Sequence, residues 1–223
     1  MSISENITKV KARIESAAAR AGRESGSITL VAVTKTVDAS KIREAIDAGI
    51  TDIGENYMQD AAQKFDILGH AAKWHMIGHL QSRKARQAVE IFDLIQSVDS
   101  LSLSQEIGKR SLVLGKTTSV LIEVNISAEE SKFGVAPDEV AALSDAVASV
   151  DGVKLEGLMG IAPFVDDETS IRRSFARLKT LWDYLPAEHR IWLSMGMTSD
   201  FEIAIEEGSN MVRVGTAIFG PRG

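Results

Sequence analysis

The sequence contains no cysteine, which limits both its cross-links and its metal chemistry. Without thiols the chain has no disulfide and no thiolate metal site, as is usual for a cytoplasmic protein. Long apolar runs are missing too, and no segment approaches the roughly 20 residues that span a bilayer. The N-terminal segment does not match a signal peptide, because charges interrupt any hydrophobic region. We therefore expect a cytoplasmic protein with no membrane partner.

Basic residues are not in excess either. The chain has 25 Lys and Arg against 31 Asp and Glu, for a formal net charge of −6. A non-specific nucleic-acid binder usually has a basic surface, so we expect no nucleic-acid partner. The four prolines are scattered, and no glycine- or serine-rich linker divides the chain. This predicts one domain over residues 1–223.

What the chain does have is a regular alternation of short apolar strands and segments with helical periodicity, typical of βα units. An amphipathic N-terminal helix comes first, with Ser2 and Glu5 as a capping box and Gly22 at its end. The expected strands are 28–34, 51–54, 73–78, 94–98, 119–125, 154–159, 191–195 and 211–214. The expected helices between them are 39–48, 57–68, 82–90, 100–114, 137–148, 169–185 and 200–207. Eight such units close a (β/α)₈ barrel, and an open doubly wound sheet is the alternative.

A lysine follows the first of these strands. Lys35 comes directly after the apolar run that ends at Thr34, and the C-terminal ends of the strands form the active face of such barrels. Burial disfavours the charged form of an amine, and a neutral amine can attack an aldehyde. A lysine at this place can equally extend its charge to water along its apolar stem. The residues alone leave both roles open.

The loops after the seventh and eighth strands contain small and hydroxyl-bearing residues. Thr198 and Ser199 follow the seventh strand, and Gly215 and Thr216 follow the eighth. Barrels often bind phosphate with these two loops, through backbone N–H groups and a helix N-terminus. Alternatively, Thr198 or Ser199 caps the next helix and Gly215 is a turn glycine. Both loops together favour phosphate, and with Lys35 they suit a phosphorylated carbonyl compound such as pyridoxal phosphate or a sugar phosphate.

Arg213 lies inside the eighth strand between apolar neighbours. A buried guanidinium needs a partner, because an uncompensated buried charge is unfavourable. The partner could be a carboxylate such as Glu55. In a pyridoxal phosphate site it would be the pyridine nitrogen, which a permanently protonated guanidinium would leave unprotonated.

Three histidines surround the third strand and raise the question of a metal site. His70 precedes the strand, His75 lies within it and His79 follows it. No cluster of carboxylates accompanies them, so we expect core or rim histidines and no metal.

Several motifs in order carry a family resemblance. They are LVAVTKT (30–36), IGENYMQDA (53–61), WHMIGHLQSRKA (74–85), LIEVNIS (121–127), SKFG (131–134), LEGLMGIAP (155–163) and LSMGMTSDFEIAIEEGSNMVRVGTAIFG (193–220). Through them nearly the whole chain resembles the YggS/PROSC family of pyridoxal phosphate homeostasis proteins. Two positions depart from the usual pattern. Thr198 stands where serine is usual and keeps the hydroxyl, and Arg83 stands where asparagine is usual.

The resemblance implies a single (β/α)₈ barrel of the alanine racemase N-terminal type, with an additional N-terminal helix and with pyridoxal 5'-phosphate held on Lys35 as a Schiff base. It implies that Thr198, Gly215 and Thr216 hold the phosphate, that Arg213 faces the pyridine nitrogen, and that Asn56 and His79 line the pocket. Ser199, next to Thr198 in the same loop, is added to the expected binding residues because of its hydroxyl group.

Members of this family are regarded as cofactor carriers or regulators in vitamin B6 balance, without an established catalytic activity. A racemase needs a second acid/base group, which a tyrosine from an additional C-terminal domain supplies in the related alanine racemases. This sequence ends soon after the eighth strand, and neither Tyr57 nor Tyr184 has motif support as that base. We therefore expect a monomeric carrier of pyridoxal phosphate that can pass it to apo-enzymes. The alternatives are a weak amino-acid racemase and a lyase or aldolase acting on a sugar phosphate.

Overall fold

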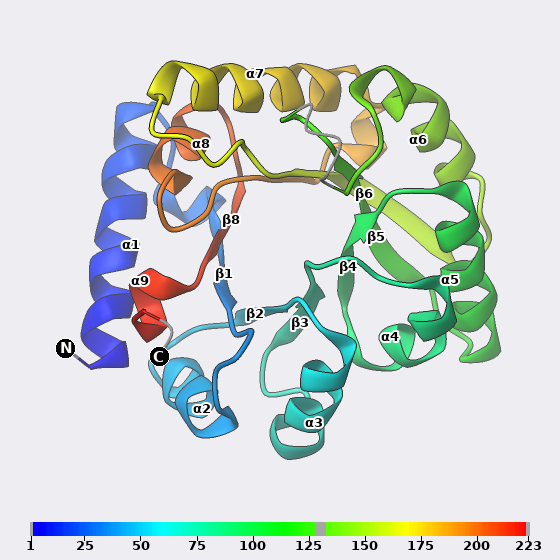
Figure 1. The fold of residues 1–223 in the computed structure, drawn as a ribbon, viewed down its shortest axis with the longest axis horizontal. Coiled ribbons are helices and arrows are strands. Elements are labelled where there is room, and N and C mark those ends of the chain that lie inside the picture. Colours follow the sequence, from blue (N-terminus) through cyan, green and yellow to red (C-terminus); the bar gives the residue numbers. More distant parts are fainter. Residues whose placement is uncertain (1, 128–132, 222–223) are drawn as a thin grey trace.

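Eight parallel strands close into a barrel in chain order, each connected to the next through helices on the outside (Figure 1). The structure, a computed structural model, describes residues 2–127 and 133–221. The strands are β1 (Thr29–Val33), β2 (Asp52–Glu55), β3 (Lys73–Met76), β4 (Leu94–Val98), β5 (Thr118–Val124), β6 (Val153–Gly160), β7 (Trp192–Ser194) and β8 (Met211–Val214). Strand β1 pairs in parallel with both β2 and β8. This closure confirms the predicted (β/α)₈ barrel and overturns the open-sheet alternative.

The helices form a ring around the barrel (Figure 1). They are α1 (Ile3–Arg20), α2 (Ala39–Asp47), α3 (Met58–Leu68), α4 (Ala85–Ile91), α5 (Leu101–Val113), α6 (Val140–Ala148), α7 (Glu168–Tyr184), α8 (Phe201–Glu206) and α9 (Thr216–Phe219). Short 3₁₀ turns open two predicted helices, at Ser82–Lys84 and Pro137–Glu139. Helix α9 was not predicted, because four residues are too short to display a helical period. No helix in the described part of the chain is both long and apolar enough to cross a lipid bilayer.

The predicted capping box of α1 is present. The Ser2 hydroxyl accepts the Glu5 backbone N–H at 3.2 Å, and the Glu5 carboxylate accepts the Ser2 N–H at 2.8 Å. The helix ends one residue earlier than expected, at cap residue Ala21, and Gly22 follows with φ 66°. Glycine adopts this left-handed backbone without a steric penalty, so it turns the chain away from the helix.

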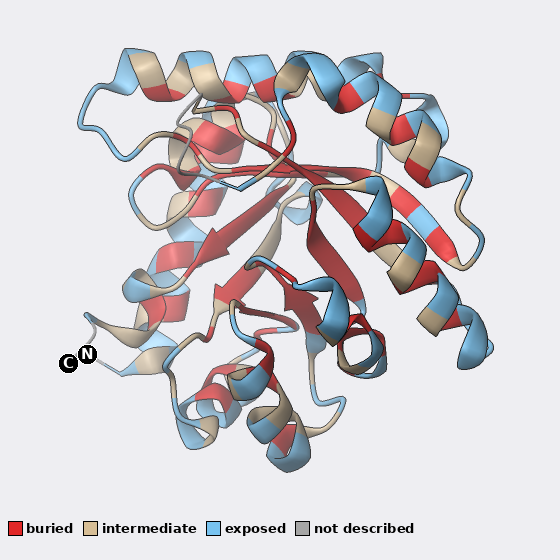
Figure 2. Cartoon of the chain, turned by 45° about the vertical axis from the view of Figure 1, so that its right-hand side comes forward, coloured by how far each residue is buried: buried red, intermediate tan, exposed pale blue. Residues whose placement is uncertain are grey.

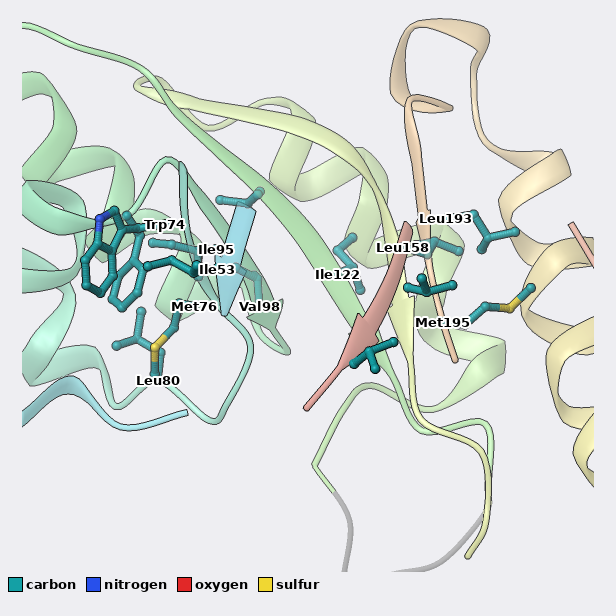
Figure 3. Packing of buried hydrophobic residues seen from close by; sticks show 14 of the residues in the cluster. Ile53, Trp74, Met76, Leu80, Ile95, Val98, Ile122, Leu158, Leu193 and Met195 are labelled. Carbon is teal, nitrogen blue, oxygen red and sulfur yellow. The ribbon is translucent and has the colours of Figure 1, made fainter. Parts of the chain in front are cut away.

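The hydrophobic core has two layers, one outside the barrel wall and one within it. Between strands and helices pack side chains such as Trp74, Ile95 and Leu158 (Figure 3). Figure 2 shows the strands almost entirely buried. Inside the barrel a smaller cluster contains Val31, Leu94, Leu121, Met159 and Met211. Each such side chain contributes roughly 1.5–3 kcal/mol when fully buried.

Polar residues follow the inner apolar cluster toward the C-terminal ends of the strands. Alternate residues of a strand point to the same side, so the positions two residues after Leu94, Leu121 and Met211 also face the barrel interior. These positions are Gln96, Glu123 and Arg213, and all three are buried. On these three strands the inward-facing positions therefore change from apolar to polar toward the mouth of the barrel.

Gly157 allows β6 and β7 to pair closely. It has φ 147°, and a Cβ atom there would lie 1.8 Å from the carbonyl oxygen of Trp192, its partner on β7. Only glycine fits this position without moving a strand.

Candidate functional site

All eight residues predicted to bind the cofactor lie at the C-terminal ends of the strands. Lys35 follows β1, Asn56 follows β2 and His79 follows β3. Thr198 and Ser199 follow β7, Gly215 and Thr216 follow β8, and Arg213 lies within β8. Parallel strands bring these ends to one face of the barrel, which is the usual position of active sites in this architecture.

Lys35, which is half-buried, lies in a tight turn between β1 and α2. The turn is closed by the Val37 N–H, which donates to the Thr34 carbonyl at 3.0 Å. Thr36 has φ 64°, a left-handed conformation that is unfavourable for a side chain by about 1–2 kcal/mol. The surrounding structure must therefore hold this turn in place.

A buried ion pair between Lys64 and Glu55 holds the turn in place. Lys64 Nζ of α3 donates to the Thr34 carbonyl at 2.7 Å and pairs with Glu55 Oε1 at 2.6 Å. The Thr34 hydroxyl donates to the same carboxylate oxygen, also at 2.6 Å. Burial raises the pKa of Glu55, and its hydrogen bonds with Lys64 and Thr34 offset only part of that rise. Because the Thr34 carbonyl belongs to the peptide bond that leads into Lys35, this group of residues fixes the backbone at the lysine.

Lys35 shares a cavity with the loop after β8. The cavity has a volume of about 180 Å³, and Lys35, Gly215 and Thr216 line it together with Lys41. Their proximity follows from the closure of the barrel, which makes β1 and β8 neighbours. The structure thus brings together Lys35 and one of the two predicted phosphate loops.

The two predicted phosphate loops are linked to each other. The Thr198 hydroxyl oxygen accepts the backbone N–H of Gly215 at 3.3 Å. Neither Thr198 nor the exposed Ser199 caps α8, because the cap residue is Asp200, whose carboxylate accepts the Met197 N–H at 2.6 Å. The helix-cap alternative for these two hydroxyl residues is therefore wrong.

Asn56 and His79 lie at the same mouth but line a different cavity. That cavity has a volume of about 520 Å³, and Arg83 contributes to its wall. The His79 ring stacks on Phe133 with centroids 4.0 Å apart, and its Nδ1 lies 3.6 Å from the Asp99 carboxylate. Asn56 Oδ1 is buried and has no hydrogen-bond partner within the described ranges. Ser131 and Lys132, from the SKFG motif, lie outside the described residues.

Arg213 is buried in the barrel interior. Its Nη1 donates to the Ser194 hydroxyl at 2.6 Å, and its Nη2 donates to the Gly160 carbonyl at 2.9 Å. Burial lowers the pKa of Arg213 to about 10, against the opposite influence of Glu123 and Asp200. The group remains a cation at neutral pH. Glu55, proposed above as a possible partner, pairs with Lys64 instead.

One more buried ionisable group, which the sequence reasoning did not single out, lies on β5. Glu123 points into the barrel from β5. Burial raises its pKa to about 7; the positive charge of Arg213 opposes this rise, and the charge of Asp99 adds to it. The sequence contains a signal for this buried group, because Glu123 interrupts the apolar run LIEVN just as Arg213 interrupts MVRVG.

The histidines near β3 bind protein groups. His75 Nε2 lies 3.0 Å from Asp52 Oδ1, and its Nδ1 lies 2.9 Å from Gln96 Nε2. The His70 ring meets the ring of Phe65 edge-on at 4.9 Å. Across residues 2–127 and 133–221, no three histidine or carboxylate side chains are arranged to hold a metal ion.

Comparison with known proteins adds independent findings. The family model described as alanine racemase, N-terminal domain, matches residues 6–223. The pyridoxal phosphate homeostasis protein of Pseudomonas aeruginosa is 42% identical over 221 residues, covering 99% of this chain and 96% of that protein. The structure of PipY from Synechococcus elongatus with pyridoxal phosphate bound has a TM-score of 0.85 and 33% identity, covering 98% of this chain and 100% of PipY. An alanine racemase from Clostridium difficile shares the fold, with a TM-score of 0.76 and 14% identity over 99% of this chain and 56% of that one.

Proposed function

The chain belongs to the alanine racemase N-terminal domain family, and from that premise we propose that it binds pyridoxal 5'-phosphate and maintains the cytoplasmic balance of this cofactor. One observation carries the proposal: Lys35, Gly215 and Thr216 line one cavity at the barrel mouth. The similarity to a P. aeruginosa protein named for pyridoxal phosphate homeostasis supports it. So does the likeness to PipY, whose structure contains pyridoxal phosphate.

The residues present fit the chemistry of this cofactor. When bound, pyridoxal phosphate supplies an electrophilic aldehyde and an electron-accepting ring. In the proposal the Lys35 amine is the covalent attachment point, and Arg213 donates a hydrogen bond to the ring nitrogen. The phosphate is held by hydroxyl and backbone N–H groups of the two loops, from Thr198, Ser199, Gly215 and Thr216. Asn56 and His79 line the neighbouring cavity at the same mouth, and in the proposal they contact the part of the cofactor that extends toward it.

We further propose that the protein acts as a single-domain, monomeric carrier over residues 1–223, without catalytic turnover. The cavity is at the open end of the barrel, and its lining residue Thr216 is exposed. A cofactor held there can be passed to apo-enzymes that use it.

The test is to load the purified protein with pyridoxal phosphate, record its absorbance, reduce it with borohydride and map the modified peptide. We expect the label on Lys35 and its loss in Lys35→Ala. Lys41→Ala is the matched control, because Lys41 lines the same cavity. A label on Lys41, or unchanged affinity and spectrum in Lys35→Ala, would contradict the assignment of the attachment point.

A weak amino-acid racemase is the second candidate, and Glu123 favours it. A racemase needs a proton-transferring group besides the lysine, and a pKa of about 7 suits proton transfer at neutral pH. Exchange of the α-proton of alanine for deuterium would then be faster with loaded protein than with the cofactor alone, and slower in Glu123→Gln. Equal rates in all three samples would leave the carrier function.

A further inference from the structure

A continuous chain of hydrogen bonds crosses the barrel interior from β8 to β2. It begins with Arg213 Nη1 and the Ser194 hydroxyl, 2.6 Å apart, and continues from Ser194 to Gln96 Oε1, again at 2.6 Å. Gln96 Nε2 then meets His75 Nδ1 at 2.9 Å, and His75 Nε2 meets Asp52 Oδ1 at 3.0 Å. All five residues are buried, with at most 7% of their surface exposed.

Every link in the chain has a fixed direction. A guanidinium has no acceptor, so the Ser194 oxygen accepts from Arg213 and its proton goes to Gln96 Oε1. The Gln96 amide then turns its NH₂ group toward His75 Nδ1, which must accept. The His75 proton is therefore on Nε2, where it donates to Asp52. The series of hydrogen bonds thus runs from the Arg213 cation to the Asp52 carboxylate, and each donor is matched to an acceptor.

Arg213 and Asp52, the two ends of this hydrogen-bond series, are charged groups that further contacts hold in place. Arg213 also donates to the Gly160 carbonyl at 2.9 Å, so two of its nitrogens are bonded to the barrel wall. Asp52 also accepts from the Thr51 hydroxyl at 2.7 Å. Burial would raise the pKa of Asp52, but the hydrogen bonds from His75 and Thr51 bring it below its ordinary value. Asp52 is thus an ionised acceptor at neutral pH.

We propose that Gln96 and Ser194 are positioning residues for Arg213, which they hold in the single orientation needed to donate to the ring nitrogen of the cofactor. The inference rests on the proposed function. Arg213 depends on them because its guanidinium is linked to Ser194, whose hydroxyl has its direction set by Gln96. Buried polar networks of this kind stabilise one arrangement when complete, and removal of one member leaves its neighbours unpaired.

A matched set of variants separates positioning from general stability. Gln96→Met has a similar volume but removes the acceptor for Ser194. Gln96→Met and Gln96→Glu both lose the donor to His75 Nδ1, but Gln96→Glu keeps the acceptor for Ser194, because one carboxylate oxygen replaces Oε1. Ser111→Ala removes a different buried hydrogen bond, the 2.7 Å contact between Ser111 and Thr118, which has no link to Arg213.

The first readout uses the protein without cofactor. In arginine-labelled ¹⁵N NMR spectra, a fixed buried guanidinium gives separate Nη–H signals, whereas a rotating one gives a merged signal. We expect separate Arg213 signals, assigned through their absence in Arg213→Lys, in wild type, Gln96→Glu and Ser111→Ala. In Gln96→Met they should merge. If Gln96→Met does not fold, Ser194→Ala, which removes only the hydroxyl, takes its place with the same expectation.

The second readout is the rate of pyridoxal phosphate release from the loaded protein, followed by its absorbance. We expect release about tenfold faster in Gln96→Met, the change expected when one hydrogen bond to a charged group is lost. The rate in Gln96→Glu should be close to that of wild type. Unchanged Arg213 signals and release in Gln96→Met, or equal effects in Gln96→Glu or Ser111→Ala, would overturn the positioning role. Failure of the wild type to take up pyridoxal phosphate would instead reject the proposed function, and the NMR comparison would still decide whether Gln96 and Ser194 hold Arg213 in one orientation.

Discussion

Replacement of Glu123 by glutamine is expected to stabilise the protein at pH 8 and to leave its stability almost unchanged at pH 4. The glutamate side chain is buried in the barrel interior. Burial raises its pKa from the ordinary value of 4.5 to about 7, although Arg213 is close enough to oppose the rise. Glutamine has the same shape as the protonated acid and never has to be charged in this interior.

The direction and the size of the expected change in the free energy of unfolding follow from the linkage between folding and proton binding. Between pH 4.5 and about 7 the folded chain keeps a proton on Glu123 that the unfolded chain has already released. Unfolding therefore releases a proton, and the free energy of unfolding falls as pH rises through this window. At about 1.4 kcal/mol for each pH unit, the loss in the wild type is roughly 3 kcal/mol once the pH exceeds 7. The glutamine variant avoids this loss.

The assay is urea denaturation of both proteins at several pH values from 4 to 8.5. The difference in free energy of unfolding should grow from near zero at pH 4 to roughly 3 kcal/mol at pH 8. Glu44→Gln, an exposed position on α2, is the control and should change stability by less than about 0.5 kcal/mol at every pH. Comparing variants removes the contribution of all other titrating groups.

A difference that does not vary with pH would refute the reasoning. So would a variant that is less stable than the wild type at pH 8. In that case the attraction between the Glu123 carboxylate and the Arg213 guanidinium would outweigh the cost of burying the carboxylate.

Three further substitutions test other parts of the structure. Lys64→Met leaves the Glu55 carboxylate buried without the cation that lies 2.6 Å from it. We expect the free energy of unfolding, measured from denaturation curves, to fall by about 3–5 kcal/mol. The double variant that also carries Glu55→Gln should recover much of this loss. Thr36→Gly removes the left-handed penalty at φ 64° and should add about 1 kcal/mol in the same assay; a loss would mean that the threonine side chain holds the turn. Gly157→Ala places a Cβ 1.8 Å from the Trp192 carbonyl and should lower the free energy of unfolding by more than about 3 kcal/mol; an unchanged melting temperature would mean that β6 and β7 can separate at no cost.

Local patterns in the sequence predicted the elements well. Strands β4 and β8 have the predicted bounds, and the other strands differ by one or two residues at their ends. Short apolar runs, turn residues and helical periods are properties of neighbouring residues, so they can be read without knowing the fold. The number of βα units then implied a barrel, and with it the placement of Lys35, Thr198 and Gly215 at one face.

The contacts inside that face could not be predicted, because they depend on which strands become neighbours. Glu55 was a candidate partner for Arg213, but helix α3 brings Lys64 to it instead. The real partners of Arg213 come from β6 and β7. Asn56 and His79 were grouped with Lys35, but they line a separate cavity.

The sequence by itself determined the strands, the helices and the order in which chemically active side chains reach the barrel mouth. The tertiary structure decided which of them share a cavity and how their charges behave. The contact of β1 with β8 joins residues 182 positions apart, such as Thr29 and Met211, and no local pattern encodes it. The pKa of Glu123 likewise arises from the low dielectric constant of the closed interior, and the orientation of Arg213 arises from its hydrogen bonds to Ser194 and Gly160. Both exist only after the barrel has formed.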